Sequence, residues 1–302
     1  MRFRRYALER IGAALGVFCL AVVGIFVICH VIGPMELRGS QTDPRVYARY
    51  LSYAHESFGD YLWRLLSGSL APSLYARRVG GFSITDATLV TLSLVGWTVF
   101  IGLLIAVPLG FLWDWRPRWT RLVAVPFVYL AASLLTVWVA LKLGYYLGFK
   151  WDIFPISGYV NFFDDPIQWA YHLILPAFVL CLPFGAIYTR VVRASLRNVR
   201  HARADAPPEE RDRAVGAARR AGLITVTKGL LRDIGYLIGF ALFAEVAFQL
   251  PGLGLTLELA TFNADTPVVE SVLIFATLVA VGIHLAGTLV GGALSKQWRL
   301  GA

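Results

Sequence analysis

The chain has 302 residues, of which 57% are hydrophobic and only 16% are charged. A soluble domain usually carries about 25% charged residues, and an uncharged apolar run within it rarely exceeds about 14 residues. The apolar residues here form blocks long enough to cross a bilayer, which argues against a soluble globular protein. The net charge of +9 does not indicate nucleic-acid binding, because the basic residues gather at block ends and in alternate connections.

The first apolar block follows three arginines near the N-terminus, as in a secretory signal peptide. It is too long for a signal, and no small-x-small cleavage site follows it, so we predict a retained span. A helix satisfies its own backbone polar groups in hydrocarbon, and the alternating pattern of a β-barrel is absent, so the predicted fold class is all-α. The six predicted transmembrane helices are 11–32, 88–112, 122–147, 173–192, 235–250 (with Leu230 as an alternative start) and 268–289.

Lysine and arginine indicate how the chain is oriented in the membrane. They occur at both chain ends, after the second block, and eleven times from Arg190 to Asp233, where there are five acids. The connections 152–172 and 251–267 carry acids and no lysine or arginine. Both termini are therefore predicted to be cytoplasmic in a multi-pass inner-membrane protein. The predicted organisation is one transmembrane domain at 1–302, an extracytoplasmic loop at 33–86 with an interfacial helix within 43–66, and a cytoplasmic segment at 193–233.

Residues that usually carry chemistry are few and scattered. Cys19, Cys29 and Cys181 lie in apolar blocks, where we expect them to pack rather than to form disulfides or bind metal. No GxxxxGK[ST] phosphate loop, zinc motif or nucleophile elbow occurs. His284 is a lone histidine within a span, for which a packed, hydrogen-bonded role is expected. The sequence therefore predicts a transport protein and not an enzyme, with no catalytic residue, metal site or cofactor of its own.

Several short stretches occur in a recognisable order along the chain. They are GSLAPSL at 68–74, ATL at 87–89, VPLG at 107–110, FPISGY at 154–159, HLILPA at 172–177 with RVVRAS at 190–195, EVAFQLPGLG at 245–254 and TPVV at 266–269. In sequence and in order they resemble motifs of the permease subunits of oligopeptide, dipeptide and nickel ABC importers. The resemblance extends over most of the chain, although Leu250 stands where the family has a tryptophan.

The cytoplasmic segment contains a stretch similar to the family's ATPase-contacting loop, E-D-Y-V-x-x-A-x-A-x-G-L. Its matching residues are Asp212, Val215, Ala218, Gly222 and Leu223. The alanines favour a slim helix that fits a partner's groove, and Gly222 is expected to end that helix with a positive φ. Arg219 and Arg220 would add charge for an acidic rim. The alternative is an ordinary basic helix beside anionic lipid.

The resemblance implies a type I importer permease fold and a set of partners. The chain would pair with a second, homologous permease to enclose the translocation pathway, and two ATPase subunits would bind the ATP. An extracytoplasmic binding protein would deliver the ligand. As a hypothesis, Glu245, Pro251, Gly252 and Gly254 lie near the outer gate, because exposed backbone at a break in a span is tolerated only beside a cavity. Peptides are the leading substrate, with nickel chelates, glutathione and sugars left open.

The chain departs from the family pattern in three places. The polar run 200–211, with Pro207 and Pro208, lengthens the path into the coupling stretch. The sequence after Gly222 is shortened to KGLLRD, and SKQ replaces the usual Asp-Pro-Arg ending. These differences motivate an alternative function, a membrane scaffold or assembly subunit of a divergent ABC complex without tight transport coupling. A stand-alone carrier is a third alternative, and it predicts transport by this chain alone in liposomes.

Overall fold

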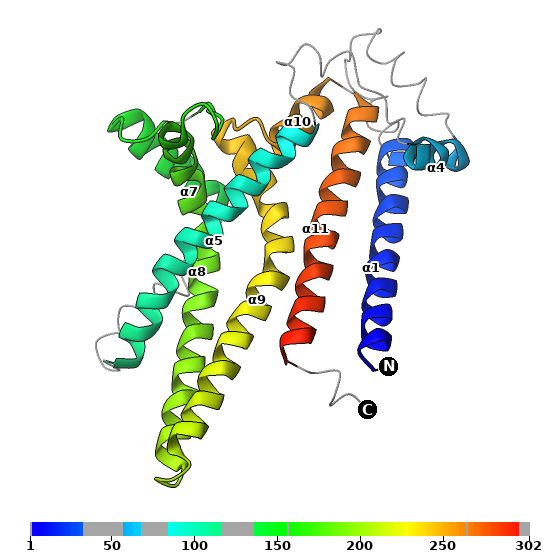
Figure 1. Ribbon diagram of the computed structural model, residues 1–302. Coiled ribbons are helices and arrows are strands. Elements are labelled where there is room, and N and C mark those ends of the chain that lie inside the picture. The colour runs from blue at the N-terminus through cyan, green and yellow to red at the C-terminus, as the bar shows by residue number, and fades with distance from the viewer. Residues whose placement is uncertain are drawn as a thin grey trace.

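The computed structural model describes residues 2–32, 57–67, 84–115, 136–155, 157–263 and 265–295, and within these ranges the chain is helical with no strand. In chain order the elements are α1 (Arg2–Phe26), the π-helix η1 (Val27–Ile32), α4 (Phe58–Ser67), α5 (Ile84–Trp115), α7 (Thr136–Leu143), the π-helix η2 (Gly144–Lys150), α8 (Pro166–Asp205), α9 (Arg211–Phe248), α10 (Leu253–Phe262) and α11 (Thr266–Ser295). The long helices run side by side as a bundle (Figure 1). The predicted all-α class is confirmed.

Four helices among the described residues are long and apolar enough to cross a membrane, namely α1, α5, α8 and α11. A fifth crossing is added if α9 and α10, which meet at an angle of 66°, are counted as one bent pair. The predicted third span, 122–147, is described only from Thr136 onward, where it forms α7 and η2. Its first part lies outside the described residues, and a multi-pass membrane protein is the architecture that these helices support.

The fourth and fifth helices extend far beyond their apolar blocks. We predicted spans at 173–192 and 235–250, whereas α8 covers Pro166–Asp205 and α9 covers Arg211–Phe248. Hydropathy marks only the part of a helix that suits hydrocarbon, so it misses polar extensions. The basic segment 193–233 forms the C-terminal end of α8, the N-terminal part of α9 and the turn between them.

Local signals explain where these two helices begin and end. Asp165 caps α8, because its Oδ1 accepts from the backbone N–H groups of Ile167 at 2.9 Å and Gln168 at 3.1 Å. Ala206 adopts extended backbone after α8, as the residue before a proline usually does. The chain then reverses and α9 begins at Arg211, so α8 and α9 form an antiparallel hairpin (Figure 1).

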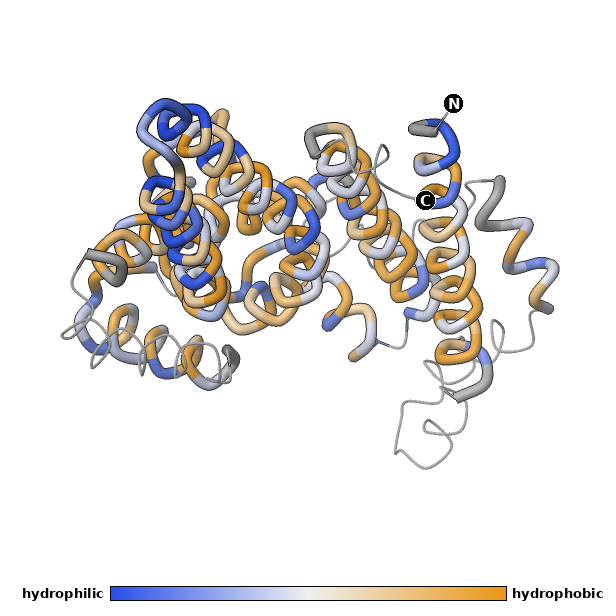
Figure 2. Tube along the Cα trace, turned by 90° about the horizontal axis from the view of Figure 1, so that it is seen from below, coloured by the Kyte–Doolittle hydropathy of each residue, from blue (hydrophilic) through white to orange (hydrophobic). Residues whose placement is uncertain are grey.

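The core lies where α5, α8 and α9 pack together. Gly102 of α5 and Gly185 of α8 allow close approach, since a Cβ on Gly185 would lie 3.4 Å from the Gly102 carbonyl oxygen. Large buried side chains fill the rest of this contact: Leu94, Leu173, Leu180, Phe184, Tyr188, Ile238 and Phe248. Hydrophobic residues dominate the middle of the bundle, and hydrophilic ones gather at the tip of the hairpin and the N-terminal end of α1 (Figure 2).

The short helix α4 lies across the end of α1 that is farthest from the hairpin tip (Figure 1). Tyr61 of α4 is fully buried against Phe26, with ring centroids 5.2 Å apart, while Trp63 is exposed. Beneath it, His30 Nδ1 lies 3.3 Å from Glu270 Oε1 of α11. One buried face and one exposed face are typical of an interfacial helix. The remainder of the predicted interfacial helix, up to residue 56, lies outside the described residues.

Candidate functional site

The predicted coupling stretch lies on α9 within the hairpin. Val215, Ala218 and Gly222 are half-buried and share one helix face. A Cβ on Gly222 would lie 3.0 Å from Ser195 Cβ and 3.4 Å from Ser195 Oγ, so this face packs against α8. The absence of a side chain at this position lets the two helices approach closely.

The predicted role of Gly222 as a helix terminator is wrong. The helix continues through Gly222 from Arg211 to Phe248. Among the glycines that the structure describes, Gly158 has a positive φ and Gly222 does not. A single glycine interrupts a helix only weakly, costing about 1 kcal/mol relative to alanine, and the packing of α8 against α9 outweighs that cost. The coupling stretch and the fifth span are thus parts of one continuous helix.

The other coupling residues face outward. Asp212, Arg219 and Leu223 are exposed and recur at the seven- and four-residue spacings that keep them on one side of the helix. Leu223 is 69% exposed, which is unusual for a large apolar side chain in a basic, polar hairpin. This side of α9 thus combines an exposed apolar side chain with charges of both signs.

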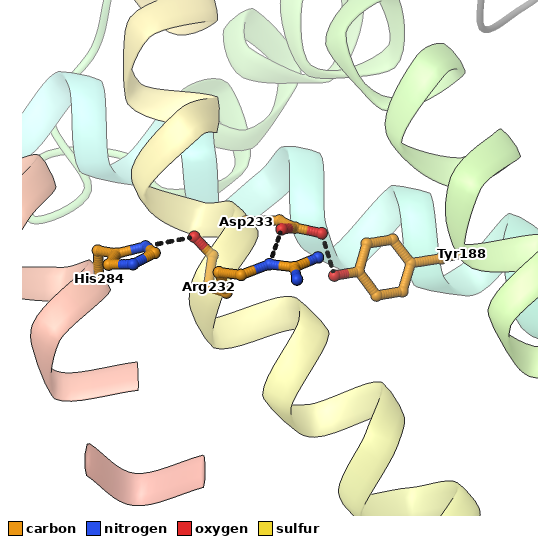
Figure 3. Close-up of polar contacts among 4 residues, drawn as sticks. All are labelled: Tyr188, Arg232, Asp233 and His284. Carbon is orange, nitrogen blue, oxygen red and sulfur yellow. Dashed lines mark hydrogen bonds and ion pairs between the residues drawn. The ribbon is translucent and has the colours of Figure 1, made fainter. Parts of the chain in front are cut away.

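A polar network connects three helices above the coupling stretch (Figure 3). The Tyr188 hydroxyl of α8 donates to Asp233 Oδ2 of α9 at 2.8 Å, and Arg232 Nε donates to Asp233 Oδ1 at 2.9 Å. His284 Nδ1 of α11 lies 3.2 Å from the Arg232 carbonyl oxygen, which confirms the hydrogen-bonded role expected for this histidine. The network joins α8, α9 and α11 at one level of the bundle.

The Tyr188–Asp233 bond is the part of this network with the largest structural effect. Tyr188 is almost fully buried, so its hydroxyl needs an acceptor, and Asp233 provides one. The Arg232 side chain is 60% exposed, so its ion pair with Asp233 contributes little to stability. These residues were not among the predicted site residues, although a tyrosine within an apolar block and an Arg-Asp pair at the edge of the next block are signals that the sequence contains.

The outer end of α9 forms a sharp break. Gln249 adopts left-handed backbone with φ of 51°, and the Leu250 N–H returns to the Glu245 carbonyl oxygen at 2.9 Å, which ends the helix. Pro251 and Gly252 form the turn, and α10 begins at Leu253. Leu250, at the position of the family's tryptophan, is buried in the core.

Glu245 caps the helix that follows this break. Its side chain is fully buried, and its Oε2 accepts from the Gly254 N–H at 2.6 Å. The neighbouring Leu253 N–H bonds to Thr91 Oγ1 of α5 at 3.2 Å. The first N–H groups of α10 are therefore satisfied by side chains from two other helices, and a carboxylate suits the positive end of a helix dipole.

The two glycines of the turn have no room for a side chain. A Cβ on Gly252 would overlap the Glu245 carboxyl group, and a Cβ on Gly254 would overlap the Leu242 carbonyl oxygen. The structure thus brings Glu245, Gly252 and Gly254 together, with Pro251 in the turn beside them. The Glu245 carboxylate points at the start of α10, so capping and close packing explain why an acid and two glycines occur in the stretch 245–254. Its predicted place at an outer gate stays a prediction.

In the described ranges, no group of three or more His, Cys, Asp or Glu side chains lies close enough to hold a metal ion.

Comparison with profiles of known protein families returned no match. Comparison with individual proteins found several relatives. A putative peptide transport system permease of Brucella suis is 29% identical over 237 residues, covering 75% of this chain and 74% of that protein. A probable peptide ABC transporter permease of Sinorhizobium fredii is 26% identical over 212 residues, covering 66% and 67%.

A third relative matches nearly the full length. The glutathione transport system permease GsiC of Salmonella choleraesuis is 25% identical, with 97% of this chain and 98% of that protein covered. These similarities and the ordered motifs agree with one another, and the structure supplies the apolar helices that a membrane permease requires. Over most of its length the chain is thus similar to permease proteins of peptide and glutathione ABC transporters.

Proposed function

We propose that the chain is one permease subunit of an ATP-driven importer and that it forms, with a second homologous permease, a pathway for peptides or a similar small solute. The relatives from Brucella and Sinorhizobium are described as peptide transport permeases, and the Salmonella relative as a glutathione transport permease. Glutathione is itself a small peptide, so the two descriptions are chemically consistent. The fold in this proposal is the six-span type I importer fold.

The observation that carries the proposal is the unbroken course of α9. One helix of 38 residues contains both the coupling stretch and the fifth span, with its next break at Gln249. A force applied near Ala218 would therefore move the membrane part of α9 without being absorbed by a flexible joint. Tyr188 and His284 would carry the movement to α8 and α11, and the turn at Pro251 would carry it to α10. Such tilting of packed helices is a known form of conformational change.

The arrangement of the charged ends supports a cytoplasmic hairpin. The hairpin tip, the N-terminal end of α1 and the C-terminal end of α11 all lie at the same end of the bundle (Figure 1). The basic residues of the chain concentrate there, as expected for the cytoplasmic side of an inner-membrane protein. In this orientation two separate ATPase subunits bind and hydrolyse the ATP below the bundle, and the extracytoplasmic binding protein delivers the ligand at the opposite end.

The exposed side of the coupling stretch is the proposed ATPase contact. Arg219→Glu reverses a charge on this side, while Arg203→Glu makes the same change on an exposed position of α8 outside the stretch. Co-purification of the ATPase subunits with the tagged chain is expected to fall with the first variant and to persist with the second. Loss of the ATPase in both variants, or in neither, would contradict this contact.

Coupling itself is tested by a bulky substitution at the helix contact. Gly222→Leu would force α8 and α9 apart at Ser195, so the assembled complex in liposomes should hydrolyse ATP without driving uptake. Gly216→Leu adds the same side chain to the same helix where no atom lies within 4 Å of the new Cβ, and uptake should continue. Normal uptake with Gly222→Leu would overturn the coupling role.

The scaffold alternative makes a different prediction for the wild-type complex. A non-transporting subunit would co-purify with partners, yet the complex would show no ligand-stimulated ATP hydrolysis with any peptide mixture. Transport by this chain alone in liposomes would instead favour a stand-alone carrier.

A further inference from the structure

A cavity of about 350 Å³ lies between α1 and α9, and residues of α11 also line it. Both α1 and α9 pack against α11, and the cavity occupies the gap that this arrangement leaves. Each of the three helices contributes at least one small residue to the lining, which leaves room between the larger side chains. The lining includes Ala13 and Ala14 of α1, Gly235 of α9 and Ala280 of α11.

An apolar gap of this kind requires an apolar occupant. Its walls are mainly hydrocarbon, and apolar cavities do not hold water stably. Left empty, the lining atoms would lose their dispersion contacts on one side. In a bilayer the available material of matching polarity and shape is a lipid acyl chain.

One end of the cavity carries a positive charge. Arg10 lines it, and its guanidinium lies over the Tyr6 ring at 5.3 Å from the centroid. In the part of the chain that the structure describes, no carboxylate pairs with Arg10, whereas the nearby Arg5 pairs with Glu9 at 3.2 Å. Two other polar groups of the lining are already engaged, since His284 bonds to the Arg232 carbonyl oxygen and the Thr288 hydroxyl to that of Leu285. Arg10 is therefore the arginine of the lining whose charge can meet an anion.

Arg10 also lies at a suitable depth. The Tyr6 hydroxyl donates to the Thr288 carbonyl oxygen at 3.4 Å, which sets the first turns of α1 beside the last turns of α11. This is the end of both helices where the basic residues of the N-terminus lie. The cavity extends from there toward Val17, deeper in the apolar part of α1. A phosphate at Arg10 with an acyl chain running toward Val17 follows the orientation of a phospholipid in that leaflet.

We propose that this groove binds one anionic phospholipid, with its phosphate at Arg10 and an acyl chain between α1 and α9. Basic pockets between transmembrane helices are a recognised form of anionic lipid site. The lipid would fill the gap that separates α1 from α9 and hold α1 against the bundle. This inference depends on membrane embedding alone and not on coupling to an ATPase, so failure of either proposal leaves the other standing.

The test uses the purified full-length chain and native mass spectrometry after addition of phosphatidylglycerol or phosphatidylcholine. The wild type should retain one phosphatidylglycerol more strongly than phosphatidylcholine. Arg10→Gln should weaken phosphatidylglycerol retention about fivefold, the effect of one basic residue near an anionic surface. Arg5→Gln, which removes a charge already paired with Glu9, should leave retention unchanged.

A second pair of variants tests the groove itself. Ala14→Phe should fill the cavity and abolish retention of the bound lipid, while Ala286→Phe adds the same ring at an exposed position of α11 outside the lining. Soluble glycerol phosphate should not compete, because it lacks the acyl chain; effective competition would identify a free-anion site and overturn the lipid proposal. Equal retention of both lipids, or equal loss with Arg5→Gln and Arg10→Gln, would overturn it as well.

Discussion

The two ends of α9 make close contacts through glycines, but the contacts differ in kind. At the outer break, Gly252 faces a buried carboxylate and Gly254 faces a backbone carbonyl oxygen. In the inner hairpin, Gly222 faces the side chain of Ser195. A Cβ on Gly229 would lie 3.1 Å from the Tyr188 hydroxyl oxygen. The Leu242 backbone cannot move aside without disturbing a helix, and the Gly254 N–H holds the Glu245 carboxylate in place, whereas the Ser195 side chain can shift by a few tenths of an ångström.

The difference separates a fixed joint from an adjustable one. The outer break is held by a helix cap, a left-handed residue and two glycines without space, so α9 and α10 should move together. The hairpin is held by contacts between glycines and side chains, which can adjust more easily than backbone contacts. Substitutions at the outer break should therefore lower the free energy of unfolding more than substitutions in the hairpin do.

The largest effect is expected from Gly254→Ala. The added Cβ would overlap the Leu242 carbonyl oxygen, so the backbone must shift, and we expect the free energy of unfolding to fall by about 3 kcal/mol or more. Thermal unfolding of the chain in detergent measures the change. Gly239→Ala in the preceding helix α9 is the control, because nothing lies within 4 Å of its new Cβ. Similar melting temperatures for the two variants would show that the outer joint is not fixed as described.

Removal of the cap should have the next largest effect. Glu245→Ala leaves the buried Gly254 N–H without its acceptor, which costs about 1–3 kcal/mol before any cavity is counted. Glu245→Gln keeps an acceptor oxygen and should retain much of the stability. Thermal unfolding of both variants measures the difference. An unchanged melting temperature for Glu245→Ala would contradict the capping role.

The polar network between the two ends should contribute less. Tyr188→Phe removes the hydroxyl that donates to Asp233, and we expect a loss of about 1 kcal/mol because one partly buried hydrogen bond disappears. Tyr236→Phe is the matched control, since that tyrosine is 64% exposed. If both variants unfold at the same temperature, the network does not tie α8 to α9.

The smallest effect is expected within the hairpin. Gly216→Ala should stabilise the chain by about 0.5–1 kcal/mol, because alanine is the better helix former and the site is open. Gly222→Ala should lose most of that gain, since its Cβ would lie 3.0 Å from Ser195 Cβ. Combining Gly222→Ala with Ser195→Gly in a double-mutant cycle should reveal a favourable coupling between the two changes. Strictly additive effects would contradict direct contact at this point.

The sequence predicted the class of the molecule because that class depends on properties of single segments. The apolar blocks at 88–112 and 268–289 lie within α5 and α11, and the motifs indicated the same kind of permease as the relatives that the chain resembles. The acid and the turn at 245–254 were also selected in advance. What the pattern could not indicate was that the carboxylate of Glu245 points at the N-terminus of α10.

Helix length and helix contacts were beyond the reach of the pattern. Hydropathy ended the fourth span at Val192, yet α8 continues to Asp205, because nothing before Pro207 prevents a helix and the partner α9 supports it. Gly222 was expected to stop a helix, and it instead allows one helix to lie against another.

Apolar block length, charge distribution and turn residues are local properties, so the amino-acid sequence was enough to predict a helical membrane permease. The contacts of Gly222 with Ser195, of Tyr188 with Asp233 and of Glu245 with Gly254 join different helices. Such contacts depend on the rotation and separation of packed helices, which a single sequence does not encode segment by segment. They became visible when the helices were placed together in three dimensions.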